Sequence, residues 1–161
     1  MVLFHEGGLE QNKDDPGQIT NLGVSLRFYK KRIKPDATEQ DIKDLTVNQA
    51  TEIYHDYFWA RQPFADIDDQ EIANRVFDLH INTGQGISLL QKAINASTRS
   101  HLIVDDMLGI KTLDATNVAA PDILYAELIV QAKAFYEDLA AHNASDKQFL
   151  AGWLSRLNSA P

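Results

Sequence analysis

The chain has 161 residues, of which 44% are hydrophobic and 24% are charged, a composition typical of a single soluble globular domain. Its net charge of −8 argues against a nucleic-acid partner, because phosphate binding needs a basic surface. Cysteine is absent, which excludes disulfides and thiolate metal sites. A membrane-spanning helix needs about 20 consecutive apolar residues, and no stretch of the sequence approaches that length.

Apolar residues at helical spacing begin after Gly23. In this first part of the chain, Thr38 and Thr46 are each followed three positions later by a residue that completes a helix N-cap. Gly84 is typical of a helix end. The sequence therefore predicts helices over residues 24–33, 39–45 and 47–57, and a further helix that follows Asp69 and stops at Gly84.

The second part of the chain also predicts helices, with one interruption. We expect Gly86–Asn95 to form a helix and Leu102–Val104 to form a short strand or an extended arm. Pro121 suits the first turn of a long helix, and Ser145 with Gln148 predicts a capping box for a final helix. The predicted apolar stripe of the long helix consists of Leu124, Leu128, Ala132, Phe135 and Leu139.

A polar segment near the N-terminus carries the candidate catalytic residues. Glu6 follows the apolar run Val2–Phe4, which favours a protonated carboxyl group, whereas Asp15 lies in a polar turn that favours the ionised form. A glycosidase needs both: one carboxyl group protonates the leaving oxygen, and another group handles water or the cationic sugar. The ordinary alternatives are an exposed carboxylate for Glu6, a turn residue for Asp15 and a helix cap for Thr20.

The order Glu6, Asp15, Thr20, with the intervening Gly-Gly and Asp-Asp-Pro-Gly, resembles the N-terminal signature of glycoside hydrolase family 108. That family contains bacterial and phage N-acetylmuramidases, often labelled secretion activator proteins. The resemblance implies that Glu6 is the general acid. It also implies that Asp15 and Thr20 place or activate the hydrolytic water.

The resemblance continues along most of the chain. Tyr57-Phe58-Trp59 stands where the family has an aromatic cluster, and Phe77-Asp78 with Asn82-Thr83-Gly84 resembles a family segment of the type F-D-x-x-x-N-x-G. The residues that resemble the family's predicted peptidoglycan-binding region are Leu90-Gln91, Asp105, Gly109 and Lys111-Thr112-Leu113.

Three further residues are candidate substrate contacts. Tyr57 and Trp59 offer flat aromatic faces that stack on sugar rings, although half-buried core positions are an equal alternative. Asn82 could bond the N-acetyl group of the substrate or cap the end of its helix. The five histidines lack metal-ligand spacing and no G-x-S-x-G sequence occurs, so we expect neither a metal site nor a cofactor.

The sequence departs from the family pattern at Leu9, Gln18 and Leu22, and again at Asp106 and Ile110. The departures near the N-terminus motivate one alternative, a non-catalytic peptidoglycan-binding or secretion-accessory protein with the same fold. Another alternative is a glycan lyase or chitinase-type hydrolase in which the N-terminal glutamate acts alone.

Together these features predict a mainly α, lysozyme-like fold with an irregular or short β loop near the N-terminus. We expect a catalytic half over residues 1–75 and a helical peptidoglycan-binding half over residues 76–161, packed as one compact unit. The expected activity is that of an N-acetylmuramidase acting on peptidoglycan glycan strands, with a monomer favoured. We expect synthesis in the bacterial cytoplasm and action in the periplasm or cell wall after export by a holin-like or dedicated route.

Overall fold

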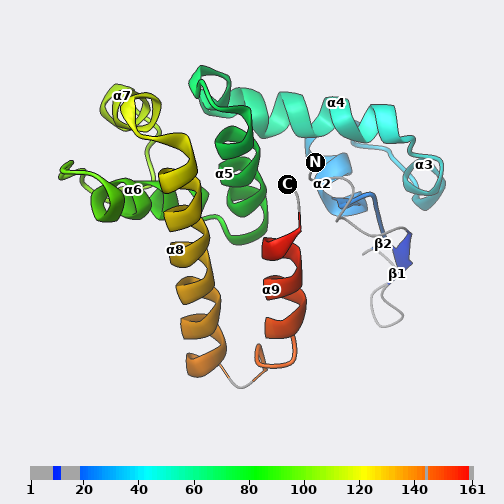
Figure 1. The fold of residues 1–161 in the computed structure, drawn as a ribbon. Coiled ribbons are helices and arrows are strands. Elements are labelled where there is room, and N and C mark those ends of the chain that lie inside the picture. Colours follow the sequence, from blue (N-terminus) through cyan, green and yellow to red (C-terminus); the bar gives the residue numbers. More distant parts are fainter. Residues whose placement is uncertain (1–8, 12–18, 144, 160–161) are drawn as a thin grey trace. The chain divides into compact units, whose positions relative to one another are not determined.

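The computed structural model describes residues 9–11, 19–143 and 145–159 (Figure 1). It is mainly α-helical with a short sheet near the N-terminus, which confirms the predicted fold class. The chain divides into two compact units, Met1–Phe58 and Trp59–Pro161. Each unit is described by itself.

The first unit contains a three-stranded antiparallel sheet of β1 (Glu10–Gln11), β2 (Ile19–Asn21) and β3 (Val24–Ser25), with β2 in the centre. Leu22 and Gly23 join β2 to β3, and their φ angles are 50° and 76°. A two-residue turn with positive φ at both positions suits the twist of a hairpin. Glycine adopts this conformation freely, whereas a leucine is strained in it.

The helices of the first unit are α2 (Leu26–Arg32), α3 (Glu39–Lys43) and α4 (Val47–Tyr57). The structure confirms both predicted N-caps, because Thr38 and Thr46 each accept a hydrogen bond from the backbone N–H three residues later. Helix α2 begins later than predicted, because residues 24 and 25 pair with β2 before the helix starts.

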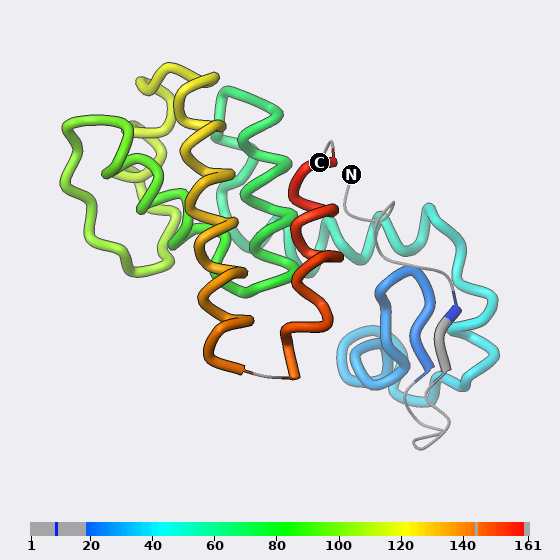
Figure 2. Tube along the Cα trace, turned by 60° about the horizontal axis from the view of Figure 1, so that its bottom comes forward, coloured from blue at the N-terminus to red at the C-terminus, as the bar shows by residue number. Residues whose placement is uncertain are grey.

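The second unit is helical throughout its described elements. Two short 3-10 helices, η1 (Trp59–Arg61) and η2 (Phe64–Asp66), precede five longer helices. These are α5 (Gln70–Thr83), α6 (Gly86–Ser97), α7 (Ile110–Val118), α8 (Pro121–His142) and α9 (Leu150–Asn158). Helix α8 packs beside α5, α6 and α9 (Figures 1 and 2). The buried side chains of these helices form the core. Gly84 ends α5 with a φ of 68°, as predicted for a helix end.

Two segments of the second unit test predictions made from the sequence. Leu102–Val104 is not a strand, which removes one of its two predicted alternatives. Its first residue is held by the Asn95 side chain, which bonds the Leu102 C=O at 2.8 Å and the Leu102 N–H at 2.7 Å. The capping box predicted at Ser145 is wrong. The Ser145 hydroxyl donates to the Asn143 side chain at 2.8 Å instead, and α9 begins only at Leu150.

The buried stripe of α8 differs from the predicted one in its second half. Its first three members are buried as predicted, but Tyr136 and Ala140 are buried in place of Phe135 and Leu139. The cause is helix α9, which packs against this half of α8 with the Trp153 ring stacked on Tyr136 at 5.3 Å. A partner helix thus selects which of two adjacent faces is covered.

Candidate functional site

Of the three predicted catalytic residues, only Thr20 is among the residues that the structure describes. Glu6 and Asp15 lie outside the described residues, so their roles stay predictions. Thr20 lies on β2, between β1 and β3. Successive side chains on a strand point to opposite faces, and Ile19 is fully buried, so Thr20 points away from the buried face. Thr20 is half-buried, and its hydroxyl has no hydrogen-bond partner among the described residues.

Thr20 does not cap the following helix, which corrects one of the alternatives. Ser25 has that role, since its hydroxyl accepts a hydrogen bond from Phe28 N–H at 3.2 Å. The neighbouring Asn21 donates to the backbone oxygen of Ile42 at 3.0 Å and thereby ties β2 to α3. The strand that carries Thr20 is therefore held by its sheet partners and by a helix.

Tyr57 and Trp59, the candidate sugar platforms, pack into different aromatic clusters, one in each unit. The Tyr57 ring meets Phe28 edge-on at 5.6 Å, and its hydroxyl donates to the backbone oxygen of Arg32 at 2.8 Å. The Trp59 ring meets Phe77 edge-on at 5.0 Å. Both rings are half-buried, so each has one part covered by protein and another part exposed.

Asn82 lies near the end of α5 and lines a pocket of about 410 Å³ within the second unit. Helices α5, α8 and α9 supply its walls. The polar lining consists of Asn82, Thr83 and Arg156, and the apolar lining of Phe135, Tyr136, Leu139 and Trp153. We call this cavity the Trp153 pocket.

A buried ion cluster fixes the polar wall of the Trp153 pocket. The Asp78 carboxylate, only 3% exposed, accepts a hydrogen bond from Arg156 Nη2 at 2.8 Å and lies 3.6 Å from Arg75 Nη1. Arg75 also donates to the Tyr125 hydroxyl at 3.1 and 3.2 Å. Asn82 joins the cluster, since its Nδ2 donates to the backbone oxygen of Asp78 at 2.6 Å. Charged hydrogen bonds of this kind hold side chains in one geometry.

The aromatic wall is equally well supported. The Trp153 and Tyr136 rings stack with 26° between their planes. Burial raises the pKa of the Tyr136 hydroxyl, and the Asp78 carboxylate adds to that rise, so this group stays protonated at neutral pH. The sequence predicted Phe135 to be part of a buried stripe. Only the pairing of α8 with α9 brings these rings to a pocket.

Gln91 organises the segment that resembles a peptidoglycan-binding region. Its side chain is 1% exposed and donates to the Asp105 carboxylate at 2.8 Å, while its oxygen accepts from the N–H groups of Asp105 and Asp106 at 3.0 and 3.1 Å. The bonds from Gln91 and from Met107 N–H hold the pKa of the Asp105 carboxyl below its usual value. Asp106, at a left-handed φ of 59°, accepts two further bonds from Ser88. This network ties the loop after α6 to that helix.

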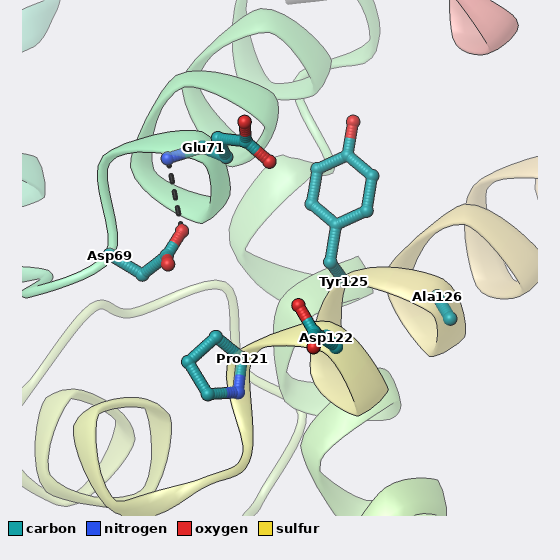
Figure 3. A pocket seen from close by; sticks show the side chains of 6 residues that line it. All are labelled: Asp69, Glu71, Pro121, Asp122, Tyr125 and Ala126. Carbon is teal, nitrogen blue, oxygen red and sulfur yellow. Dashed lines mark hydrogen bonds between the residues drawn. The ribbon is translucent and has the colours of Figure 1, made fainter.

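Two smaller pockets lie beside the first turns of α5 and α8. Figure 3 shows one of about 160 Å³, whose lining includes Asp69, Glu71, Pro121, Asp122 and Tyr125. The other, of about 190 Å³, shares Asp69 and Pro121 with it. The Asp69 carboxylate accepts a hydrogen bond from Glu71 N–H at 3.0 Å, as a helix cap does. These carboxylates therefore belong to the starts of α5 and α8, where acidic side chains stabilise a helix.

The described residues include no group of three or more His, Cys, Asp or Glu side chains that could hold a metal ion. In the same part of the chain, none of the helices combines the length and apolar character needed to cross a membrane.

Comparisons with known proteins divide the chain into two segments. Residues 1–84 match the family described as glycosyl hydrolase 108, and residues 85–158 match a predicted peptidoglycan domain. Among solved structures, the chain is similar to that of Brucella abortus SagA, with 26% sequence identity and a TM-score of 0.73. That similarity covers 97% of this chain and 84% of the Brucella chain. No curated protein sequence matches this chain.

Proposed function

This chain belongs to the glycosyl hydrolase 108 family, and we propose that it is an N-acetylmuramidase. It would cleave the β-1,4 bond between N-acetylmuramic acid and N-acetylglucosamine. The observation that carries this proposal is the order of the two matched segments, because a glycosidase segment is followed directly by a segment described as a peptidoglycan domain. A function related to peptidoglycan follows from the two matches together.

In the proposed mechanism, Glu6 protonates the oxygen of the leaving sugar. Asp15 and Thr20 hold the attacking water or stabilise the cationic sugar, as the second group of a glycosidase must. The position of Thr20 supports this role, since it lies on a braced central strand and its hydroxyl is not engaged by another described residue. The separation between the two carboxyl groups would decide between retention and inversion: about 5 Å for a nucleophile, and roughly 6.5–9.5 Å when water attacks.

Tyr57, Trp59 and Asn82 are the proposed sugar contacts. Tyr57 would offer ring surface alone, because its hydroxyl is already bonded to a backbone oxygen. Trp59 would likewise offer the part of its ring that Phe77 leaves uncovered. Asn82 would bond an N-acetyl group from the wall of its pocket.

The proposed mechanism divides the chain into two halves. Residues 1–75 would form the catalytic half, and residues 76–161 would form the peptidoglycan-binding half. The matched segments meet between residues 84 and 85, and the compact units meet between residues 58 and 59. Because peptidoglycan is the proposed substrate, the protein would act in the periplasm or cell wall. The proposed route there is a holin-like or dedicated export system.

Digestion of purified peptidoglycan tests the proposal. The wild-type protein should release muropeptides with reducing N-acetylmuramic ends, and Glu6→Gln should lower the rate by at least about 100-fold, because a general acid contributes about that much. Glu52→Gln is the matched control, since it removes an exposed carboxylate from α4 of the same unit. Mass analysis of the products resolves all these outcomes.

Two results would overturn the proposal. Products with anhydro-muramyl ends would identify a lyase. A wild-type protein that sediments with peptidoglycan but releases nothing would identify a non-catalytic binding or secretion-accessory protein.

A further inference from the structure

We infer that the Trp153 pocket binds one N-acetylated sugar unit of a glycan strand and so gives the helical unit a glycan site of its own. The inference rests on the proposed function in one respect: it takes peptidoglycan as the polymer that supplies the sugar. The main evidence is that one pocket is lined both by aromatic side chains of α8 and α9 and by the Asn82 amide of α5.

Size separates this pocket from the two smaller pockets of the same unit. Its volume of about 410 Å³ lies within the range of about 300–1,000 Å³ that is usual for small-molecule sites. The two acidic pockets, at about 160 and 190 Å³, lie below that range. Mainly apolar walls with a few polar groups are also the usual composition of such sites.

The amide of Asn82 is arranged to accept a hydrogen bond. A backbone carbonyl can only accept, so the bond to the Asp78 oxygen fixes Nδ2 toward α5 and assigns Oδ1 to the other side of the amide. Asn82 is exposed, and its Oδ1 has no partner among the described residues. The N–H of an acetamido group is a suitable donor for this oxygen.

The aromatic wall complements the rest of such a sugar. A pyranose ring has an apolar face of C–H groups, and an acetamido group ends in a methyl; both pack on aromatic surface. Phe135 is half-buried, and the indole of Trp153 is held by its stack on Tyr136, so the surface is formed before a ligand arrives. The indole N–H of Trp153, a donor only, has no acceptor among the described residues.

The charge of the lining favours a sugar over the peptide stem of peptidoglycan. Arg156 is the one charged residue of the lining, and it already bonds the Asp78 carboxylate at 2.8 Å. A stem peptide carries both carboxylates and an amine, and the lining contains no carboxylate for the amine. A neutral sugar with one amide matches these groups better.

Nuclear magnetic resonance of the full chain provides the test, because the protein has two tryptophans and hence two indole N–H signals. Titration with chitotriose should shift the Trp153 signal, and a free stem tetrapeptide should leave it unchanged. Asn82→Ala and Phe135→Ala should each raise the Kd about tenfold, the effect of losing one hydrogen bond or one ring contact. Val130→Ala, on an exposed face of α8, is the control and should keep the wild-type Kd.

The inference is overturned if chitotriose leaves the Trp153 signal in place, if both pocket variants bind within twofold of the wild type, or if only the tetrapeptide shifts the signal. Asn82 is exposed, so its replacement should not disturb folding, and circular dichroism checks this. Failure of the proposed function looks different. If the protein releases no muropeptides but chitotriose shifts the Trp153 signal, the pocket inference stands and the proposed activity fails. If the protein is active but chitotriose leaves the Trp153 signal unchanged, the proposed activity stands and the pocket inference fails.

Discussion

Gly86 lies where α6 comes close to the backbone of α5, and it gives the sharpest stability prediction. A Cβ atom added at Gly86 would lie 2.3 Å from the backbone oxygen of Val76 and 2.4 Å from the backbone nitrogen of His80. Both atoms belong to the backbone of α5, so no side-chain rotation can relieve the clash. Helices α5 and α6 would have to move apart by about 1 Å to regain ordinary contact distances.

The cost can be compared with a glycine that has room. Overpacking of this kind usually costs about 1–3 kcal/mol, and backbone on both sides places Gly86→Ala at the upper end. Gly152 lies inside α9 with nothing within 4 Å of its added Cβ, so Gly152→Ala should stabilise the protein by about 0.5–1 kcal/mol through helix propensity. At about 2–4 °C per kcal/mol for a chain of this size, Gly86→Ala lowers Tm by about 6–12 °C, and Gly152→Ala raises it by up to about 4 °C.

Thermal unfolding followed by circular dichroism at 222 nm measures both variants under identical conditions. Both glycines lie in the second unit, so the two shifts report on the same structure. If Gly86→Ala unfolds within 2 °C of the wild type, the contact between α5 and α6 is not as tight as described, and the reasoning from backbone distances fails.

Three other substitutions test separate parts of the structure. Asp41 has a pKa lowered mainly by its hydrogen bond from Lys34, so it adds stability that is present above its ordinary pKa of 3.8 and is lost as the pH falls below it. Asp41→Asn should therefore lower Tm at pH 7 and flatten the decline of Tm on acidification; an unchanged acid limb would contradict this. Gln91→Leu strands the N–H of Asp105, so hydrogen exchange should accelerate in residues 102–109, and unchanged exchange would show that the loop is held otherwise. Leu22→Asn should raise Tm by about 2–4 °C by relieving about 1 kcal/mol of left-handed strain, and a lower Tm would refute the strain.

Local signals predicted local structure well. Thr38 and Thr46 begin helices as expected, because a capping box involves only a side chain and a backbone group three residues apart. Gly84 ends α5 for a similarly local reason, a backbone angle that other residues avoid. The capping box predicted at Ser145 was wrong for an equally local reason, since the Ser145 hydroxyl donates a hydrogen bond to the nearby Asn143 side chain.

The site was less predictable, because its parts are distant in the sequence. The family resemblance selected Asn82, but nothing in the pattern indicated that Trp153 would stand across a pocket from it. That arrangement depends on how α8 and α9 turn toward each other, which also moved burial from Phe135 to Tyr136. Helical periodicity admits either face, and only the partner helix decides between them.

Helix α5 has a consequence for chimeras made between relatives of this protein. It lies inside the segment matched to the glycosidase family, yet it packs with α6 and α8 and contributes Asp78 to the bond with Arg156. In a chimera joined between residues 84 and 85, Asp78 would therefore come from one relative and the residue at position 156 from the other. A crossover between residues 58 and 59 keeps that pair together, so segments of two relatives exchanged there do not separate the buried Asp78 carboxylate from Arg156.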